Sequence, residues 1–100
     1  VCQALSTAGY DDVKVCSILG TAAFQELIAS GSCAAASSAY DMVYMGWGCA
    51  DQFIRLLNGQ ELFSPHGERT PYCVIDLTNY TGEDWVSTYD YKTDFLNLWS

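Results

Sequence analysis

Few side chains in this sequence have the types and spacing that catalysis requires. The single histidine, His66, comes two residues after Ser64, which is too close along the chain for the Ser–His pair of a usual catalytic triad. Glu83 and Asp84 form an acidic pair, but adjacent side chains in an extended loop point apart and do not work as a paired acid and base. No phosphate-binding glycine loop occurs. We therefore expect no enzymatic activity, and a solvated loop position for His66.

The cysteines do not suggest a metal site. The five of them are an odd number and include no Cys-x-x-Cys pair, so we expect no zinc site, no thioredoxin-like motif and no cofactor. Cys16, Cys33 and Cys73 fall in predicted strands and Cys49 on the apolar face of a predicted helix, which favours buried, reduced thiols. Such thiols suit a reducing compartment better than the periplasm. A disulfide stays the alternative, because pairing cannot be read from spacing.

Composition excludes two classes of partner. The net charge of the 100-residue chain is -8, and only four basic residues offset the acidic ones: Lys14, Arg55, Arg69 and Lys92. Phosphate backbones should be repelled, so we expect no nucleic-acid partner. No apolar run approaches the roughly 18 residues of a membrane span, so we expect no membrane insertion. Half of the residues are hydrophobic, which is enough for the core of one small domain.

Strands and helices alternate along the part of the chain that would position a site. Residues 13–19 are short, apolar and rich in β-branched residues, which predicts a buried strand. Thr21 as N-cap and Gly31 as left-handed C-terminal cap delimit a helix. Its apolar residues recur at three- and four-residue spacing: Ala23, Phe24, Leu27 and Ile28. Residues 33–36 follow as a second apolar run and are expected to form a strand.

A longer helix and a third strand complete the pattern. Asp41 as N-cap and Asn58–Gly59 as C-cap bound the helix. Its apolar stripe consists of Met42, Met45, Cys49, Phe53, Leu56 and Leu57. Residues 72–77 are predicted to form the third strand. The alternation predicts an α/β fold, a three-layer-type βαβαβ unit with parallel strands, right-handed crossovers and helices packed on the sheet.

The last residues form a separate packing element. We predict a turn at 82–84 and a short helix capped near Thr88 or Asp90. The apolar face of this helix consists of Tyr91, Phe95, Leu98 and Trp99. Residues 1–100 are therefore expected to form a single α/β domain. It is expected to be partial, because residues 3–9 read like the last turns of a helix whose beginning is absent.

Short motifs follow one another in a fixed order between Ala4 and about Asn79. They are Ala4-Leu5 to Gly9, Asp12-Val13-Lys14-Val15 to Gly20-Thr21, Ala29-Ser30-Gly31, Met45-Gly46, Ala50-Asp51 and Leu56-Leu57-Asn58-Gly59-Gln60. In this order and spacing they resemble the C-terminal third of type 1, ribose-binding-like periplasmic sugar-binding proteins of ABC transporters. The resemblance covers residues 4–79 and makes 80–100 a C-terminal extension.

The resemblance implies non-covalent binding of a small solute, usually a sugar or polyol, in a cleft between two lobes. It also implies a periplasmic or extracellular location, whereas the cysteine usage leaves a cytoplasmic one open. The second strand and the third strand would cross between lobes, with the long helix in the other lobe. The chain would complete neither lobe, so we expect the missing lobe of a parent protein, or self-association, to cover its apolar faces.

The candidate ligand-binding residues lie at the ends of the first two strands: Gly20, Ser37, Ser38 and Tyr40. Sugar binders of this group often carry an Asp just before the Gly that ends the first strand, where this chain has Leu19. They also tend to carry an amide at the end of the second strand, where this chain has Ser37 and Ser38. The alternative role of these two serines is to bond nearby backbone groups.

The start of the long helix also has two interpretations. Tyr40, Tyr44 and Trp47 could stack on a sugar face, or Tyr44 and Trp47 could pack between helix and sheet. Gly46 and Gly48 suggest a close approach to that helix. Two functions therefore stay open. The first is a sugar-binding fragment of a transporter's substrate-binding protein, and the second is an orphan α/β protein-interaction module that self-associates and has lost ligand binding.

Overall fold

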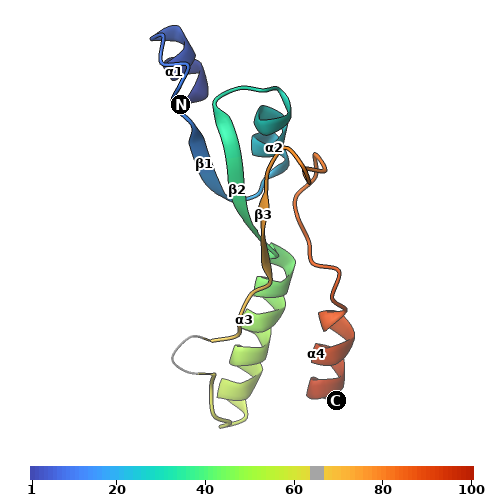
Figure 1. The fold of residues 1–100 in the computed structure, drawn as a ribbon. Coiled ribbons are helices and arrows are strands. Elements are labelled where there is room, and N and C mark those ends of the chain that lie inside the picture. The colour runs from blue at the N-terminus through green and yellow to red at the C-terminus, as the bar shows by residue number, and fades with distance from the viewer. Residues whose placement is uncertain (64–66) are drawn as a thin grey trace. The chain divides into compact units, whose positions relative to one another are not determined.

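The computed structural model describes residues 1–63 and 67–100, so the expectations for Ser64 and His66 lie outside the described residues. The element order is α1 (Cys2–Thr7), β1 (Val15–Leu19), α2 (Ala22–Ala29), β2 (Ala34–Tyr40), α3 (Met42–Leu57), β3 (Tyr72–Ile75) and α4 (Tyr91–Trp99) (Figure 1). This order confirms the predicted α/β class. None of these helices is long and apolar enough to cross a membrane.

The chain divides into two compact units. The first consists of Val1–Tyr40 and Tyr72–Trp85 and contains the sheet, α1 and α2. The second consists of Asp41–Pro71 and Val86–Ser100 and contains α3 and α4. The chain thus changes unit at the end of β2, at the start of β3 and again after Trp85.

The sheet of the first unit has the strand order β1-β2-β3. β1 and β2 are parallel, as predicted, with Ser17 opposite Ser37. β3 is antiparallel to β2, with Tyr72 opposite Tyr40, so the prediction of parallel strands holds for the first pair only. A parallel pair needs a crossover that brings the chain back to the opposite end of the sheet, and the chain makes one between β1 and β2 but not between β2 and β3.

The path of the chain after α3 explains the direction of β3. The 16 residues of α3 rise about 24 Å, yet Pro71 lies beside the beginning of that helix. There the backbone amide of Asp41 donates to the carbonyl oxygen of Pro71 at 3.1 Å. β3 therefore starts where β2 ends and can pair with it only in the antiparallel sense.

α2 packs on the sheet, and only part of its predicted apolar stripe is buried there. Gly31 ends the helix with φ of +71°, as expected for a left-handed cap. The Thr21 side chain makes no capping bond. Asp84 takes that role, because its Oδ1 accepts from the Ala22 amide at 2.8 Å. The buried residues of α2 are Gln25 and Ile28, whereas Leu27 and Ala23 of the predicted stripe are exposed.

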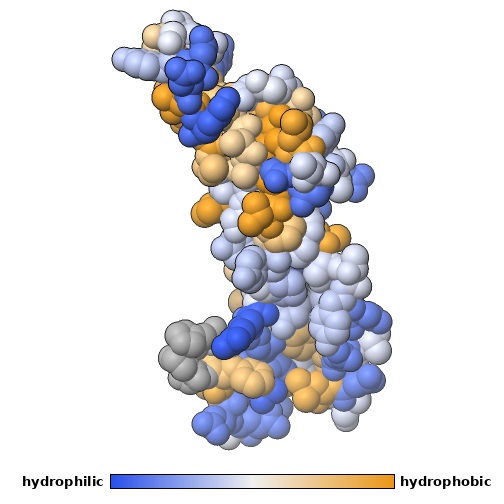
Figure 2. Space-filling model, in the orientation of Figure 1, coloured by the Kyte–Doolittle hydropathy of each residue, from blue (hydrophilic) through white to orange (hydrophobic). Residues whose placement is uncertain are grey.

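The opposite face of the sheet is open, which corrects the expected burial of residues 13–19. The buried apolar residues of this unit are Ile28, Ala34, Ala39 and Ile75. On the open face Ile18 and Tyr72 are each 70% exposed and Val74 is 58% exposed. Hydrophobic residues are accordingly visible on the surface of the part of the chain that holds the sheet (Figure 2). Periodicity identified this strand correctly, but not which of its faces is covered.

In the second unit, both ends of α3 match the prediction. Asp41 caps the N-terminus through its side chain, which accepts from the Tyr44 amide at 2.8 Å, and Gly59 follows the C-terminus with φ of +64°. The predicted apolar stripe is exposed along its whole length, and the buried residues are Gly48 and Asp51. Neither helix glycine is required by a close approach, because a Cβ at Gly46 would contact nothing and one at Gly48 would meet Glu68 at an ordinary distance.

α4 packs along α3 through aromatic side chains, which confirms that the predicted C-terminal helix is a packing element. Asp90 is its N-cap, one of the two predicted positions. Trp47 stacks on Trp99 with ring centroids 5.4 Å apart, and Tyr44 meets Phe95 at 5.7 Å. Tyr44 and Trp47 therefore pack against another helix of the same unit.

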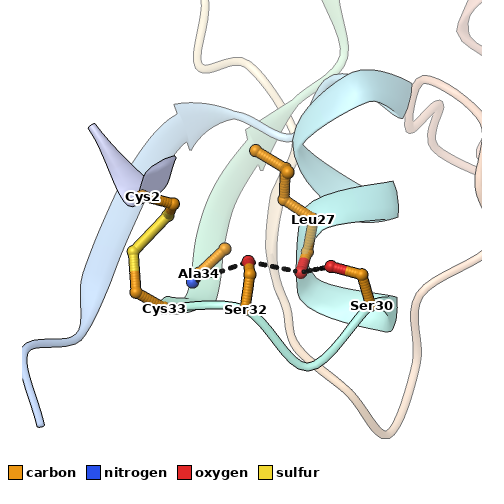
Figure 3. Close-up of a disulfide and its surroundings, with 6 residues drawn as sticks. All are labelled: Cys2, Leu27, Ser30, Ser32, Cys33 and Ala34. Atoms are coloured by element: carbon orange, nitrogen blue, oxygen red, sulfur yellow. Dashed lines mark hydrogen bonds between the residues drawn. A yellow bond between two sulfur atoms is a disulfide. The ribbon is translucent and has the colours of Figure 1, made fainter. Parts of the chain in front are cut away.

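The cysteines differ from the prediction of buried, reduced thiols. Cys2 and Cys33 form a disulfide, with their Cα atoms 5.4 Å apart (Figure 3). Cys16 and Cys49 are exposed thiols. The physical reason is that α1 has no buried residue, so a covalent link attaches it where packing does not. Ser32 shapes the connection before Cys33 by donating to the Leu27 carbonyl oxygen at 2.9 Å (Figure 3).

We expect the double variant C2S/C33S to lose about 3 to 4 kcal/mol of unfolding free energy, because the disulfide closes a loop with a sequence separation of 31. Urea unfolding of oxidised, reduced and variant protein measures this. The exposed thiol variant Cys16→Ser is the matched control and should change little. Alkylation of Cys2 and Cys33 in the unreduced protein would contradict the disulfide.

Candidate functional site

The carboxyl end of β1 holds a strained turn. Leu19 has φ of +83° and is the one non-glycine residue among those described with positive φ. For a leucine this conformation costs about 1 to 2 kcal/mol. Gly20 follows with φ of +61°, and a Cβ there would lie 2.3 Å from the Cβ of Ala39. Glycine is thus required at position 20, whereas Leu19 is held in its conformation by its surroundings.

The structure brings two of the four candidate residues together and separates the other two. Ser37 is buried, accepts from the Gly20 amide at 3.0 Å and accepts from the Ser17 hydroxyl at 2.8 Å. Ser38 and Tyr40 lie on the other face of β2, because successive side chains of a strand alternate. Gly20 and Ser37 therefore support the turn from the interior. Ser38 and Tyr40 are half-buried on the open face.

A buried amide that sequence reasoning missed supports the same turn. The Gln25 side chain donates from Nε2 to the carbonyl oxygens of Gly20 at 2.9 Å and Glu83 at 2.5 Å. Its Oε1 accepts from the amides of Thr81 at 2.9 Å and Gly82 at 3.2 Å. The only available signal was its position three residues before Ile28, on the inner side of α2.

In the second unit a buried carboxylate, that of Asp41, joins separate segments, as Gln25 does in the first unit. Asp41 accepts from the amides of Tyr44 and Ser87, each at 2.8 Å. The Tyr91 hydroxyl lies 3.4 Å from Oδ1. Burial raises the pKa of Asp41, but the bonds from the two amides outweigh it and hold the pKa below its ordinary value. Asp41 thus joins the start of α3 to the segment that leads into α4.

The second unit also contains a pocket of about 570 Å³. Its walls come from α3, from residues 63 and 67–69, and from residues between 89 and 98, most of them in α4. Three carboxylates line it, those of Asp51, Glu68 and Asp94, together with Tyr44, Tyr91 and Phe95. No group of three or more His, Cys, Asp or Glu residues in the described ranges could hold a metal ion.

The carboxylates of this pocket differ in their partners. Asp51 is buried and accepts from Arg55 Nε at 2.5 Å and from Trp99 Nε1 at 2.7 Å. Burial raises the pKa of Asp51, and these bonds outweigh it and lower the pKa. Glu68 accepts from the Gln52 amide at 3.0 Å. Burial, together with the neighbouring Asp51, raises the pKa of Glu68.

Comparison with known proteins identifies no relative. No family model matches the chain, and neither a curated protein nor a solved structure matches it significantly.

We expect Gln25→Leu to cost about 2 to 4 kcal/mol of unfolding free energy, because four backbone groups lose their partner at similar side-chain volume. Urea unfolding measures the loss, and faster amide exchange at Thr81 and Gly82 locates it. The exposed residue Gln3 provides the control Gln3→Leu, which should stay within about 0.5 kcal/mol of the parent. Equal stability of the two variants would contradict the role of Gln25.

The lowered pKa of Asp41 predicts a pH dependence. A carboxyl group with a lowered pKa in the folded state adds stability above its ordinary value of 3.8, and this is lost as the pH falls through the lowered pKa. Asp41→Asn should cost about 2 kcal/mol at neutral pH, and the difference from the parent should shrink below about pH 4. Urea unfolding across this range tests it, with the exposed Asp12→Asn as control. A pH-independent difference would contradict the assignment.

Proposed function

We propose that this chain binds a small solute without catalysis, as a segment of a type 1 sugar-binding protein of an ABC transporter. The observation that carries the proposal is the strained Leu19–Gly20 turn at the carboxyl end of β1, beside the parallel strand β2. Ligands of open α/β sheets bind outside the carboxyl ends of the strands. Backbone strain of this kind also concentrates at functional sites.

Two further observations support the assignment. The chain changes unit after Tyr40 and again at Tyr72, which are the points where the resemblance has strands crossing between lobes. The Cys2–Cys33 disulfide is typical of an oxidising compartment and so favours a periplasmic or extracellular location.

The open face next to this edge offers suitable contacts for a sugar. Ser38 presents a half-buried hydroxyl opposite Val74, and Tyr40 lies opposite Tyr72 with ring centroids 6.3 Å apart. Aromatic faces pack on the apolar faces of sugar rings, while hydroxyl groups exchange hydrogen bonds with them. In this proposal Ser38, Tyr40 and Tyr72 contact the solute, and Gly20 and Ser37 hold the turn.

The alternative function is a self-associating interaction module that has lost ligand binding. The exposure of Ile18, Tyr72 and Val74 on one face of the sheet favours it, because contiguous apolar surface of this kind is typical of interfaces. A second copy, or a missing part of a longer protein, would cover this face. Both functions use the same face, so one experiment separates them.

A panel of monosaccharides, tested by thermal unfolding with light scattering, decides between the two functions. For sugar binding we expect a monomer whose stability increases with one sugar, by about 2.7 kcal/mol at a hundredfold excess over Kd. Tyr72→Ala should abolish this increase, whereas Tyr10→Ala, another exposed tyrosine of the first unit, should not. An obligate dimer that is indifferent to every sugar would contradict the proposal and favour the alternative.

A further inference from the structure

We propose that the pocket of the second unit binds a small organic cation, an ammonium group that carries a short apolar or aromatic substituent. The pocket lies wholly within the second unit, between α3, α4 and residues 67–69. It shares no residue with the sheet edge at Leu19–Gly20. The proposal is therefore independent of sugar binding by the first unit.

The size and the walls of the pocket suit a small molecule. Its volume of about 570 Å³ falls within the roughly 300 to 1,000 Å³ of ligand pockets, which combine apolar walls with a few polar groups. Tyr44, Tyr91 and Phe95 supply aromatic walls. These rings pack on one another, with Tyr44 and Tyr91 edge to face at 5.0 Å. The walls are thus held in place before a ligand arrives, which lowers the cost of binding.

The charges of the pocket select a cation. Three carboxylates line it, and two cationic side chains oppose them: Arg69 in the lining, and Arg55, which pairs with Asp51. The chain as a whole carries a net charge of -8, which attracts cations and repels anions. An anionic ligand would face these carboxylates, and a neutral one would gain nothing from their charge. Charge complementarity therefore favours an ammonium group over both.

Glu68 is the carboxylate to which the ammonium group of the ligand would bind. Asp51 is already paired with Arg55, and Asp94 accepts from the Tyr89 hydroxyl. Within the described part of the chain, the side chain that donates to Glu68 is the neutral amide of Gln52. A ligand cation would supply a direct ionic partner here and offset the repulsion from Asp51.

Aromatic faces add to the attraction for the same ligand. Cations within about 6 Å of a ring centroid are attracted by the electrons of the ring face. The protein already contains one such pair beside the pocket, where the Arg55 guanidinium lies 4.5 Å from the ring centroid of Phe63. An ammonium held at Glu68 would have aromatic walls around its substituent. Among the described residues these carboxylates do not form a group of three or more metal ligands, which favours an organic cation over a metal ion.

Four probes that differ in charge test the proposal on the full chain: benzyltrimethylammonium, benzylamine, benzyl alcohol and benzoate. Calorimetric titration should show binding of the two cations, at least tenfold weaker binding of benzyl alcohol, and none of benzoate. Trp47 and Trp99, which pack beside the pocket-lining Phe95, offer a fluorescence signal for the same titration. Equal binding of benzyl alcohol and benzylamine would overturn the proposal, because the pocket would then be selecting apolar surface alone.

Matched charge variants locate the site. Glu68→Gln keeps the side-chain shape and should weaken binding of benzylamine at least tenfold. Glu61→Gln makes the same charge change at an exposed position of the segment after α3 and should change affinity less than twofold. Equal effects of the two variants would overturn the role of Glu68. Tyr72→Ala should leave benzylamine binding intact, which separates a failure of this site from a failure of the sheet edge.

Discussion

The hydrogen bonds of Asp41 hold together segments of the second unit that are far apart in the sequence. Its side chain starts α3 and holds the amide of Ser87, and its backbone amide bonds the carbonyl oxygen of Pro71. The last of these contacts fixes the point at which the chain re-enters the sheet, and with it the antiparallel direction of β3. Because the carboxylate is buried, the amides of Tyr44 and Ser87 that donate to it are needed to compensate for its lost hydration.

Hydrogen bonds of buried polar groups position the segments of the chain because the apolar core is small. Two of the four buried apolar residues of the first unit are alanines, Ala34 and Ala39, which bury little area. The fully buried Gln25 joins a helix to two turns that apolar contacts would not align. Such a structure depends on satisfied hydrogen bonds, because a buried polar group without a partner costs more than a formed bond contributes.

The residues that end the helices were predictable from sequence, whereas the faces of helices and strands that become buried were not. The caps at Asp41, Gly31 and Gly59 depend on a few adjacent residues, so the helix ends were correct. The direction of β3 and the exposure of the α3 stripe depend on distant segments, which periodicity does not report. The separation of Ser37 from Ser38 follows from strand alternation alone. The structure was needed only to show what each serine meets: Ser37 accepts from the Gly20 amide, and Ser38 lies on the open face.

The strain at Leu19 and the buried polar network belong to one arrangement. A backbone conformation that costs energy persists only where the surrounding structure over-determines it. Here the residue after Leu19 is held on both sides, because the Gly20 amide donates to Ser37 and its carbonyl oxygen accepts from Gln25. These two bonds fix the position of Gly20 and so limit the conformations open to Leu19. The Gln25 side chain, which joins three segments of the first unit, therefore also helps to hold the turn at the carboxyl end of β1.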